Sequence, residues 1–524
     1  MPAASYPRLM AYPAEHMSTN VLGRVSYWVT CAVLLGLSLT PVWMVTLPPL
    51  DDYPNHLARM HILLNGAISE SLSQFYDVRW ALIPNLAMDV IVPPLAKLMP
   101  LETAGKVFVT LVITILATGS LALHYAVHKR LSPWPWLAFL FLYNGMFLFG
   151  VLNFLFGLGL ALWAIAAWIK SRVYGPGARA GLFYATCLVL FFAHLSAMGV
   201  YALSVIAYEL SDSISRRTSL SVVIRWLALL TAGPLMLLAT LLLSSPGQAG
   251  NEAPPFIYGS LSFALSQKVG ALSLLVRNYV PALDAATLGL IIWALVFGLL
   301  TRVLRFGLHM RWPALAVLIA GICLPYQVMG SNFADARVVL AAAFLLVCAT
   351  DVRATRGYLI VFTVLVVALF SGRMLIVNNH WQEAEALYKQ MSSAIEQIPR
   401  GARLLAVSSR DQDRLYETPN PHLAAMAVIH KDVFLPSMYA MPRGQPLVFR
   451  EGHLELAKNA PKPDHWKGDA NNWEQAEHDY DLILLTGVER LNVPSPNTLL
   501  PVFQGSGFQL YRTRRTLPRE GHPE

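Results

Sequence analysis

The sequence predicts a polytopic α-helical membrane protein with about eleven transmembrane helices and a C-terminal soluble α/β domain. Only 13% of the 524 residues are charged, against roughly 25% in soluble domains. Apolar runs of membrane-span length recur along most of the chain, and the mean hydropathy is +0.49. Because a bilayer offers the backbone no water to bond, such runs fold as helices. The net charge of +8 is interpreted as charge on cytoplasmic loops, so no nucleic-acid partner is predicted.

The spans are placed from these apolar runs. The stretches 133–170 and 181–210 are each divided into two short helices, although one long tilted helix fits either stretch as well. The predicted spans cover residues 25–47, 105–127, 133–150, 151–170, 181–194, 195–210, 223–244, 283–303, 312–329, 336–350 and 356–376.

The basic residues orient the spans. With a cytoplasmic N-terminus, fifteen Lys and Arg side chains fall on inside segments, whereas the short outside connections hold only Arg337. An excess of cations is typical of cytoplasmic loops. An odd number of spans then puts the C-terminus on the side of the membrane opposite to the cytoplasmic N-terminus. The inside cations are Arg8, Arg24, Lys129, Arg130, Lys170, Arg172, Arg179, Arg216, Arg217, Arg225, Arg302, Arg305, Arg311, Arg353 and Arg356.

The first outside loop, residues 48–104, is far longer than a connection requires. Its segment 85–100 is apolar but only sixteen residues long, and it contains Asp89 and the helix-breaking pair Pro93 and Pro94. A span there would put every later basic loop outside, so we expect an interfacial or re-entrant helix. Long loops with structure of their own are usually functional.

The composition becomes polar after residue 376. We therefore divide the chain into a transmembrane domain, 1–376, and a soluble α/β domain, 377–524. The tail histidines lack the spacing of metal ligands and are predicted to be ordinary surface residues: His422, His430, His453, His465 and His478. The predicted elements are an amphipathic helix at 380–398 and strands at 403–408, 480–486 and 508–513.

An acidic pair opens the first outside loop at the membrane surface. Asp51 and Asp52 directly follow the first span, and Pro54 suits the first turn of a helix, where its missing N–H costs nothing. In one interpretation an aspartate only caps this helix, since Asp is a strong N-cap. One aspartate suffices for a cap, so we predict that at least one of the two takes part in catalysis or substrate binding.

Four polar side chains share one face of this helix. By i, i+3 and i+4 spacing, Asp52, Asn55, His56 and Arg59 bring a carboxylate, an amide, an imidazole and a guanidinium together. The alternative is that Arg59 only pairs with an aspartate or with a lipid phosphate. We predict that Asn55, His56 and Arg59 bind substrate.

This arrangement resembles the GT-C superfamily of membrane glycosyltransferases, which use polyprenyl-phosphate-linked sugars. The stretch DDYPNHLAR is similar to the D-x-P-x-H-x-x-R form of bacterial members, and segments 143–162, 191–197 and 334–340 also look like parts of such proteins. The resemblance covers residues 1–376 and does not extend to the C-terminal domain. It implies a multi-pass protein of the inner (cytoplasmic) membrane. The distribution of basic residues then places the N-terminus in the cytoplasm and the C-terminal domain in the periplasm.

The resemblance also implies a function. The chain would move a sugar, with inversion, from a polyprenyl-phosphate donor to a cell-envelope lipid or glycan acceptor, with Asp51 or Asp52 as the general base. The need for a divalent metal stays open, and no resident cofactor is predicted. Two alternatives remain: a transporter or flippase of lipid-linked sugars, which would be expected to show two related halves, and a non-catalytic membrane scaffold whose periplasmic domain binds a partner.

A phosphate leaving group requires cations, and Arg offers it two parallel donors. Arg337 is the predicted ligand of the donor phosphate, and the alternative is a surface pair with Asp335. His194, within an apolar run, is predicted to bind substrate, because ionisable groups at such depth are often functional. Asn144 and Asn153 either belong to the site or only form hydrogen bonds between helices.

Reporter fusions test the predicted orientation. Fusions after Arg130, Arg217 and Arg356 are expected to report a cytoplasmic position, and fusions after Ser245 and Glu524 a periplasmic one, because the inside segments hold the cations. A cytoplasmic C-terminus would contradict both the orientation and a periplasmic active site.

Overall fold

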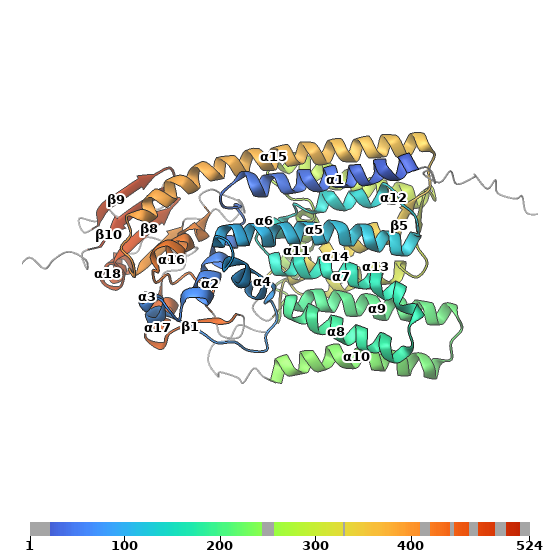
Figure 1. The fold of residues 1–524 in the computed structure, drawn as a ribbon, viewed down its shortest axis with the longest axis horizontal. Coiled ribbons are helices and arrows are strands. Elements are labelled where there is room, and N and C mark those ends of the chain that lie inside the picture. Colours follow the sequence, from blue (N-terminus) through green and yellow to red (C-terminus); the bar gives the residue numbers. More distant parts are fainter. Residues whose placement is uncertain are drawn as a thin grey trace, which may run out of the picture.

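The computed structural model is a bundle of helices that lie side by side, with a small sheet at one end (Figure 1). Arg8, His465 and the last residue of the spans predicted at 223–244 and 312–329 lie outside the described residues. The structure describes residues 21–243, 256–328, 331–408, 420–440, 445–460, 470–487 and 499–513. The bundle consists of α1 (Val21–Met44), α5 (Leu101–His128), η1 (Trp134–Phe141), α6 (Gly145–Leu148), α7 (Leu152–Lys170), α8 (Pro176–Ala193), α9 (Leu195–Ser215), α10 (Leu220–Leu243), α11 (Leu261–Leu274), α12 (Pro281–Leu300), α13 (Arg311–Cys323), α14 (Ala334–Ala349) and α15 (Arg356–Glu396).

The predicted class, a polytopic helical membrane protein, is confirmed. Within the described residues, seven helices are long and apolar enough to cross a membrane: α1, α5, α7, α8, α10, α12 and α15. The other four predicted spans coincide with η1 and α6, α9, α13 and α14, which are too short, broken or too polar to meet these criteria. Large apolar side chains on α10, α12 and α15 point away from the bundle, as expected of a surface that lipid covers.

One end of the bundle carries the first loop, and we call it the loop end. Here lie α2 (Tyr53–Asn65), α3 (Glu70–Phe75) and α4 (Ala87–Ala96). Helix α4 is the short helix predicted within 85–100. The opposite, far end carries the strand pair β3 (Leu304–Phe306) and β5 (Thr350–Val352).

The segment formed by η1 and α6 crosses between these ends although it is short. At its start, Trp134 Nε1 donates to Thr350 Oγ1 at the far end (3.0 Å). Just after its end, the Phe149 carbonyl accepts from the backbone N–H of Asp52 at the loop end (3.1 Å). A 3₁₀ helix rises about 2.0 Å per residue instead of 1.5 Å, so fewer residues cover the distance.

Helices α13 and α14 also run the length of the bundle. The Phe333 ring, just before α14, contacts Phe149 at the loop end (centroids 4.9 Å apart), and α14 ends at Ala349 beside β5. Before α13, Gly307 donates to the Ala349 carbonyl (2.7 Å), and after it Tyr326 contacts Phe333 (5.2 Å). Each helix therefore joins one end to the other.

Helix α9 makes the same passage. Before it, the Phe192 carbonyl accepts from Leu86, which precedes α4 at the loop end (2.7 Å). Near its other end, the Ser211 hydroxyl bonds Nδ1 of His309, which lies between β3 and α13 (3.0 Å). With the seven long helices, these four elements carry the chain through the bundle eleven times.

Close backbone approach holds the centre of the bundle. Helices α5 and α7 meet at Gly119 and Gly159, where a Cβ on Gly119 would lie only 2.8 Å from the Gly159 carbonyl oxygen. Small residues at such crossings increase the contact between helices in a membrane. Neighbouring η1 and α14 are buried along almost their whole length.

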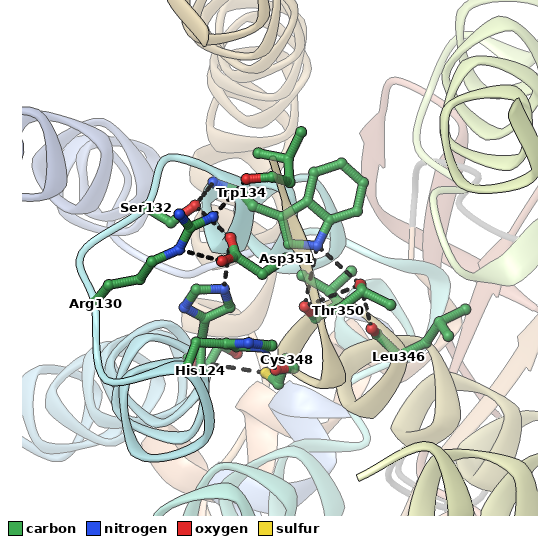
Figure 2. A network of polar contacts seen from close by, with 12 residues as sticks. His124, Arg130, Ser132, Trp134, Leu346, Cys348, Thr350 and Asp351 are labelled. Carbon is green, nitrogen blue, oxygen red and sulfur yellow. Dashed lines mark hydrogen bonds and ion pairs between the residues drawn. The ribbon is translucent and has the colours of Figure 1, made fainter. Parts of the chain in front are cut away.

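A polar network closes the far end (Figure 2). Asp351 accepts hydrogen bonds from the Arg130 guanidinium and from the Ser132 hydroxyl (2.8 Å), and His124 Nε2 lies 3.5 Å from the same carboxylate. These groups join the end of α5, the start of η1 and strand β5. The Asp351 carboxylate is therefore the centre that connects these three elements.

The C-terminal region packs against the first loop. Strand β1 (Tyr76–Val78) of the loop pairs antiparallel with β7 (Leu447–Phe449). Helix α15 is 41 residues long and continues through position 376, where the sequence placed a domain boundary, so both parts share this helix. The four-stranded sheet has the order β6-β8-β10-β9, and only β6 and β8 run parallel.

The strands predicted at 403–408, 480–486 and 508–513 are β6, β8 and β10. The remaining elements of this region are helical or pair at the sheet edge. Their bounds, in chain order, are β6 (Leu404–Ser408), η3 (Pro421–Ala425), α16 (Met426–Lys431), α17 (Glu451–Asn459), α18 (Ala470–Asp479), β8 (Leu482–Thr486), β9 (Leu500–Gly505) and β10 (Phe508–Arg512).

Candidate functional site

The turn between α6 and α7 fixes the backbone of the acidic pair. The N–H groups of Asp51 and Asp52 donate to the carbonyls of Leu148 and Phe149 (2.9 and 3.1 Å). Gly150 follows with φ +84°, and a Cβ there would lie 3.0 Å from the Asp52 nitrogen. Only glycine adopts this conformation without strain and lets the two backbones approach so closely.

The carboxylate of Asp52 faces the C-terminal region. Asp52 occupies the N-cap position of α2, but its side chain makes no capping hydrogen bond to the described start of that helix. Instead, Oδ1 accepts from the Tyr439 hydroxyl (2.6 Å). His422 Nε2 lies 3.2 Å from that hydroxyl and 3.6 Å from Oδ1, so the prediction that His422 is an ordinary surface residue is wrong.

Asparagines hold the C-terminal segments against the acidic pair. The Asn55 amide is fully buried, donates to the Ser437 carbonyl (2.9 Å) and accepts from the Tyr439 N–H (3.0 Å). Asn420 donates to the Asp51 carbonyl (2.9 Å). Asn55, predicted to bind substrate, is thus directed at backbone groups of the C-terminal region.

Arg59 forms a buried ion pair with Asp89 of α4. Its Nε and Nη2 donate to the two carboxylate oxygens (2.7 and 3.0 Å), and its Nη1 donates to Gln445 Oε1 (2.7 Å) and to His56 Nδ1 (3.2 Å). Neither side chain of the pair is more than 1% exposed. Burial, together with the charge of Arg59 and the nearby His422, holds the pKa of His56 well below its usual range, so this imidazole is neutral.

Arg337 is a buried cation at the start of α14. Its Nη1 donates to the Ser331 hydroxyl (2.7 Å), while its Nε has no hydrogen-bond partner among the described residues. Asp335 pairs with Lys268 of α11 (2.7 Å), so the alternative of a surface pair between Asp335 and Arg337 is wrong. The carboxylate of Asp52 is close enough to interact electrostatically with Arg337.

His194 lies between α8 and α9 at the same end. Its Nδ1 accepts from the Ser196 N–H (3.1 Å) and so caps α9, and its ring contacts the edge of Phe154 (5.5 Å). Arg337 is within electrostatic reach of this imidazole. The structure therefore gathers Asp52, Arg337 and His194, which come from distant parts of the sequence.

The two asparagines of the 143–162 segment have structural partners. Asn144 caps α6 by accepting from the Phe147 N–H (3.1 Å). Asn153 accepts from the Met88 N–H (2.8 Å) and donates to the Asn85 carbonyl (2.7 Å), which fixes the start of α4. Within the parts of the chain that the structure describes, no cluster of three or more His, Cys, Asp or Glu side chains has the arrangement of a metal site.

Sequence reasoning missed the partners that the C-terminal region supplies. No local sequence pattern predicts these partners, because Tyr439 stands 387 positions after Asp52. Asp89 appeared in the sequence only as an obstacle to a membrane span. These missed residues are Asp89, Asn420, His422, Tyr439 and Gln445.

Comparison with known proteins supports the fold. No protein-family model and no curated protein matches the chain. Among solved structures, ArnT from Cupriavidus metallidurans bound to undecaprenyl phosphate is similar, with a TM-score of 0.53 and 12% identity over 96% of this chain and 100% of that one. The GT-C-like fold implied by the sequence resemblance is thereby confirmed.

A double-mutant cycle tests the Arg59–Asp89 pair. Asp89→Ala and Arg59→Ala are each expected to cost about 3–5 kcal/mol of stability, because each leaves a buried charge without its partner. The double variant is expected to cost much less than their sum. The measurement is thermal unfolding of the purified protein in detergent.

The matched control is Asp77→Ala, which breaks the exposed pair between Asp77 and Arg79 (side chains 38% and 73% exposed). It is expected to cost less than about 1 kcal/mol. Additive effects of Arg59→Ala and Asp89→Ala would contradict the coupling.

Proposed function

We propose that this chain is an integral-membrane glycosyltransferase of the inner membrane. It would move a sugar from a polyprenyl-phosphate donor to a cell-envelope lipid or glycan acceptor at the periplasmic face. The observation that carries this proposal is the incompletely bonded, buried guanidinium of Arg337, which lies within electrostatic reach of the Asp52 carboxylate. A proton acceptor and a phosphate-binding cation are the two groups that such a transfer requires.

Arg337 is suited to an anionic ligand. Buried charges in proteins are nearly always paired, yet the hydrogen bond of this guanidinium goes to the neutral Ser331 hydroxyl. The nearest carboxylate on its own helix, that of Asp335, forms an ion pair with Lys268. A phosphate would supply the missing partner in the bidentate geometry that Arg favours. The undecaprenyl phosphate bound to the similar ArnT supports a polyprenyl phosphate as that ligand.

The proposed reaction is a single displacement at the anomeric carbon. The acceptor oxygen forms a bond to that carbon and gives its proton to an aspartate, while the bond from the carbon to the donor phosphate breaks. The electron pair leaves with the lipid phosphate, and the guanidinium of Arg337 stabilises the negative charge on that phosphate. Asp51 or Asp52 is the base. The Asp52 side chain is 30% exposed, whereas Asp51 is a buried residue, which favours Asp52.

The other site residues divide into two groups. The neutral His56 and His194 have polar ring atoms at the loop end, and we propose that they bind the substrates. The bonds of Asn55 and Arg59 go to Ser437, Tyr439, Asp89, Gln445 and His56. We propose that these two side chains act indirectly, by fixing the shape of the site.

Asparagine variants of the acidic pair test the base. Asn keeps the size of Asp but cannot take a proton, so the variant of the base is expected to lose about 10²–10⁴ in rate. We expect Asp52→Asn to show this loss and Asp51→Asn to retain most activity. The measurement is mass spectrometry of envelope lipids and glycans from cells that lack the protein and carry each variant, normalised to protein in the membrane.

The deletion provides the reference for these variants and identifies the acceptor. Cells without the protein are expected to accumulate an acceptor that lacks one sugar. A fully glycosylated acceptor in those cells, or near-normal transfer by both asparagine variants, would remove the proposed function.

Binding of undecaprenyl phosphate tests Arg337. Arg337→Ala is expected to weaken this binding about 10- to 100-fold, since a charged hydrogen bond is lost. Arg337→Lys is expected to restore this binding only in part, because the single ammonium group of lysine cannot donate two parallel hydrogen bonds as the planar guanidinium does. Native mass spectrometry of the purified protein with added undecaprenyl phosphate measures the change.

The control is Arg400→Ala, whose side chain is 72% exposed in a pair with Asp432. It is expected to leave binding unchanged. Equal binding by Arg337→Ala and the unmodified protein would exclude Arg337 from the site.

A further inference from the structure

Two side chains of the C-terminal region meet at the proposed base. The Tyr439 hydroxyl donates to Asp52 Oδ1 at 2.6 Å, and His422 Nε2 lies 3.2 Å from that hydroxyl. The imidazole Nε2 is also 3.6 Å from Oδ1, and the His422 side chain is 19% exposed. The three polar atoms of Tyr439, His422 and Asp52 thus form a compact triangle, although Asp52 and Tyr439 stand 387 positions apart in the sequence.

Backbone anchors hold both donors in place. Asn55 accepts from the N–H of Tyr439 and donates to the carbonyl two residues before it. Asn420 accepts from the N–H of His422 (2.7 Å) and donates to the carbonyl of Asp51 (2.9 Å). The two asparagines therefore connect each donor directly to the loop that carries the acidic pair.

The chemistry of the three groups gives the chain of hydrogen bonds a direction. A tyrosine hydroxyl has one proton, and an ionised carboxylate only accepts. If Tyr439 gives its proton to Asp52, its oxygen accepts from His422, and Nε2 of His422 carries a hydrogen. The donors then run from His422 through Tyr439 to Asp52, and each bond polarises the next.

We infer that Tyr439 and His422 are positioning residues that hold and polarise Asp52 as the base, so that the C-terminal region is part of the active site. This inference rests on the proposed transfer reaction. A hydrogen bond to the charged form also keeps the carboxylate ionised at lower pH.

Other charged and titratable groups around Asp52 do not change in the test. Among the described residues these are Arg337 of α14, His56 of α2 and the adjacent Asp51. Replacement of the Tyr439 hydroxyl alone therefore isolates its effect on Asp52.

Tyr439→Phe tests the inference, because it removes the hydroxyl and keeps the ring. The rate of transfer is expected to fall about 10-fold or more, since one hydrogen bond to a charged group is lost. The acid limb of the pH–rate profile is expected to move to higher pH, because the carboxylate loses a donor that stabilises its charged form. Membranes of the deletion strain supply both substrates, and the product is followed by mass spectrometry after addition of purified protein.

His422 variants test the second link independently of Tyr439. His422→Leu is expected to shift the acid limb in the same direction by a smaller amount. His422→Gln, whose amide also donates, is expected to restore part of the rate. This pair keeps the inference testable even if Tyr439→Phe accumulates poorly.

The control is Tyr480→Phe, whose hydroxyl donates to the Leu456 carbonyl in the same region of the chain (3.3 Å). It is expected to leave the pH profile unchanged. An unchanged acid limb in Tyr439→Phe, with Asp52→Asn inactive, would overturn this inference alone. Activity of Asp52→Asn would overturn the assignment of the base itself.

Discussion

The buried ion pair between Arg59 and Asp89 is the interaction on which the loop end depends. It joins α2 to α4 across the interior of the first loop. The pair is stable only because all oxygens of Asp89 and all nitrogens of Arg59 find partners, since an incomplete buried pair costs more than it contributes. The third nitrogen of Arg59 reaches Gln445, so the same guanidinium also attaches the C-terminal region to the loop.

Polar groups gather at both ends of the bundle, but their charged groups differ in the partners that they bind. At the far end, the Asp351 carboxylate is paired with the Arg130 guanidinium and also accepts from Ser132, with His124 beside it (Figure 2). At the loop end, the hydrogen bond of Arg337 goes to the neutral Ser331 hydroxyl, and its Nε has no hydrogen-bond partner among the described residues. An ion pair inside the protein compensates its own charges, whereas a buried cation that binds a neutral group is costly unless an anionic ligand completes it. This difference in charge pairing distinguishes the candidate site from the structural network.

Local patterns predicted what depends on local geometry. Hydropathy located the helices, the length and prolines of 85–100 predicted the short α4, and helical spacing placed Asn55, His56 and Arg59 together. Hydropathy did not predict helix α11, which lies in a segment that we expected to be an outside connection between two spans. The partners of Asp52 could not be predicted from the sequence, because hydrophobic periodicity carries no information about contacts between residues hundreds of positions apart. For the same reason the sequence analysis assigned Arg59 to substrate, to a nearby aspartate of the acidic pair or to a lipid phosphate, whereas its partner in the structure is Asp89.

The pairing of the first loop with the C-terminal region constrains the topology independently of loop charge. Strands β1 and β7 form one ladder, and Tyr439 bonds Asp52, so both regions lie on the same side of any membrane around the bundle. The chain must then cross an even number of times between the end of the loop and the start of that region. Six helices in this interval are long and apolar enough, and the four shorter elements raise the number to ten, which is also even. Since η1, α9, α13 and α14 each join opposite ends of the bundle, ten crossings fit the contacts. A criterion of helix length and hydropathy misses these four elements because they are short, broken or more polar than the others.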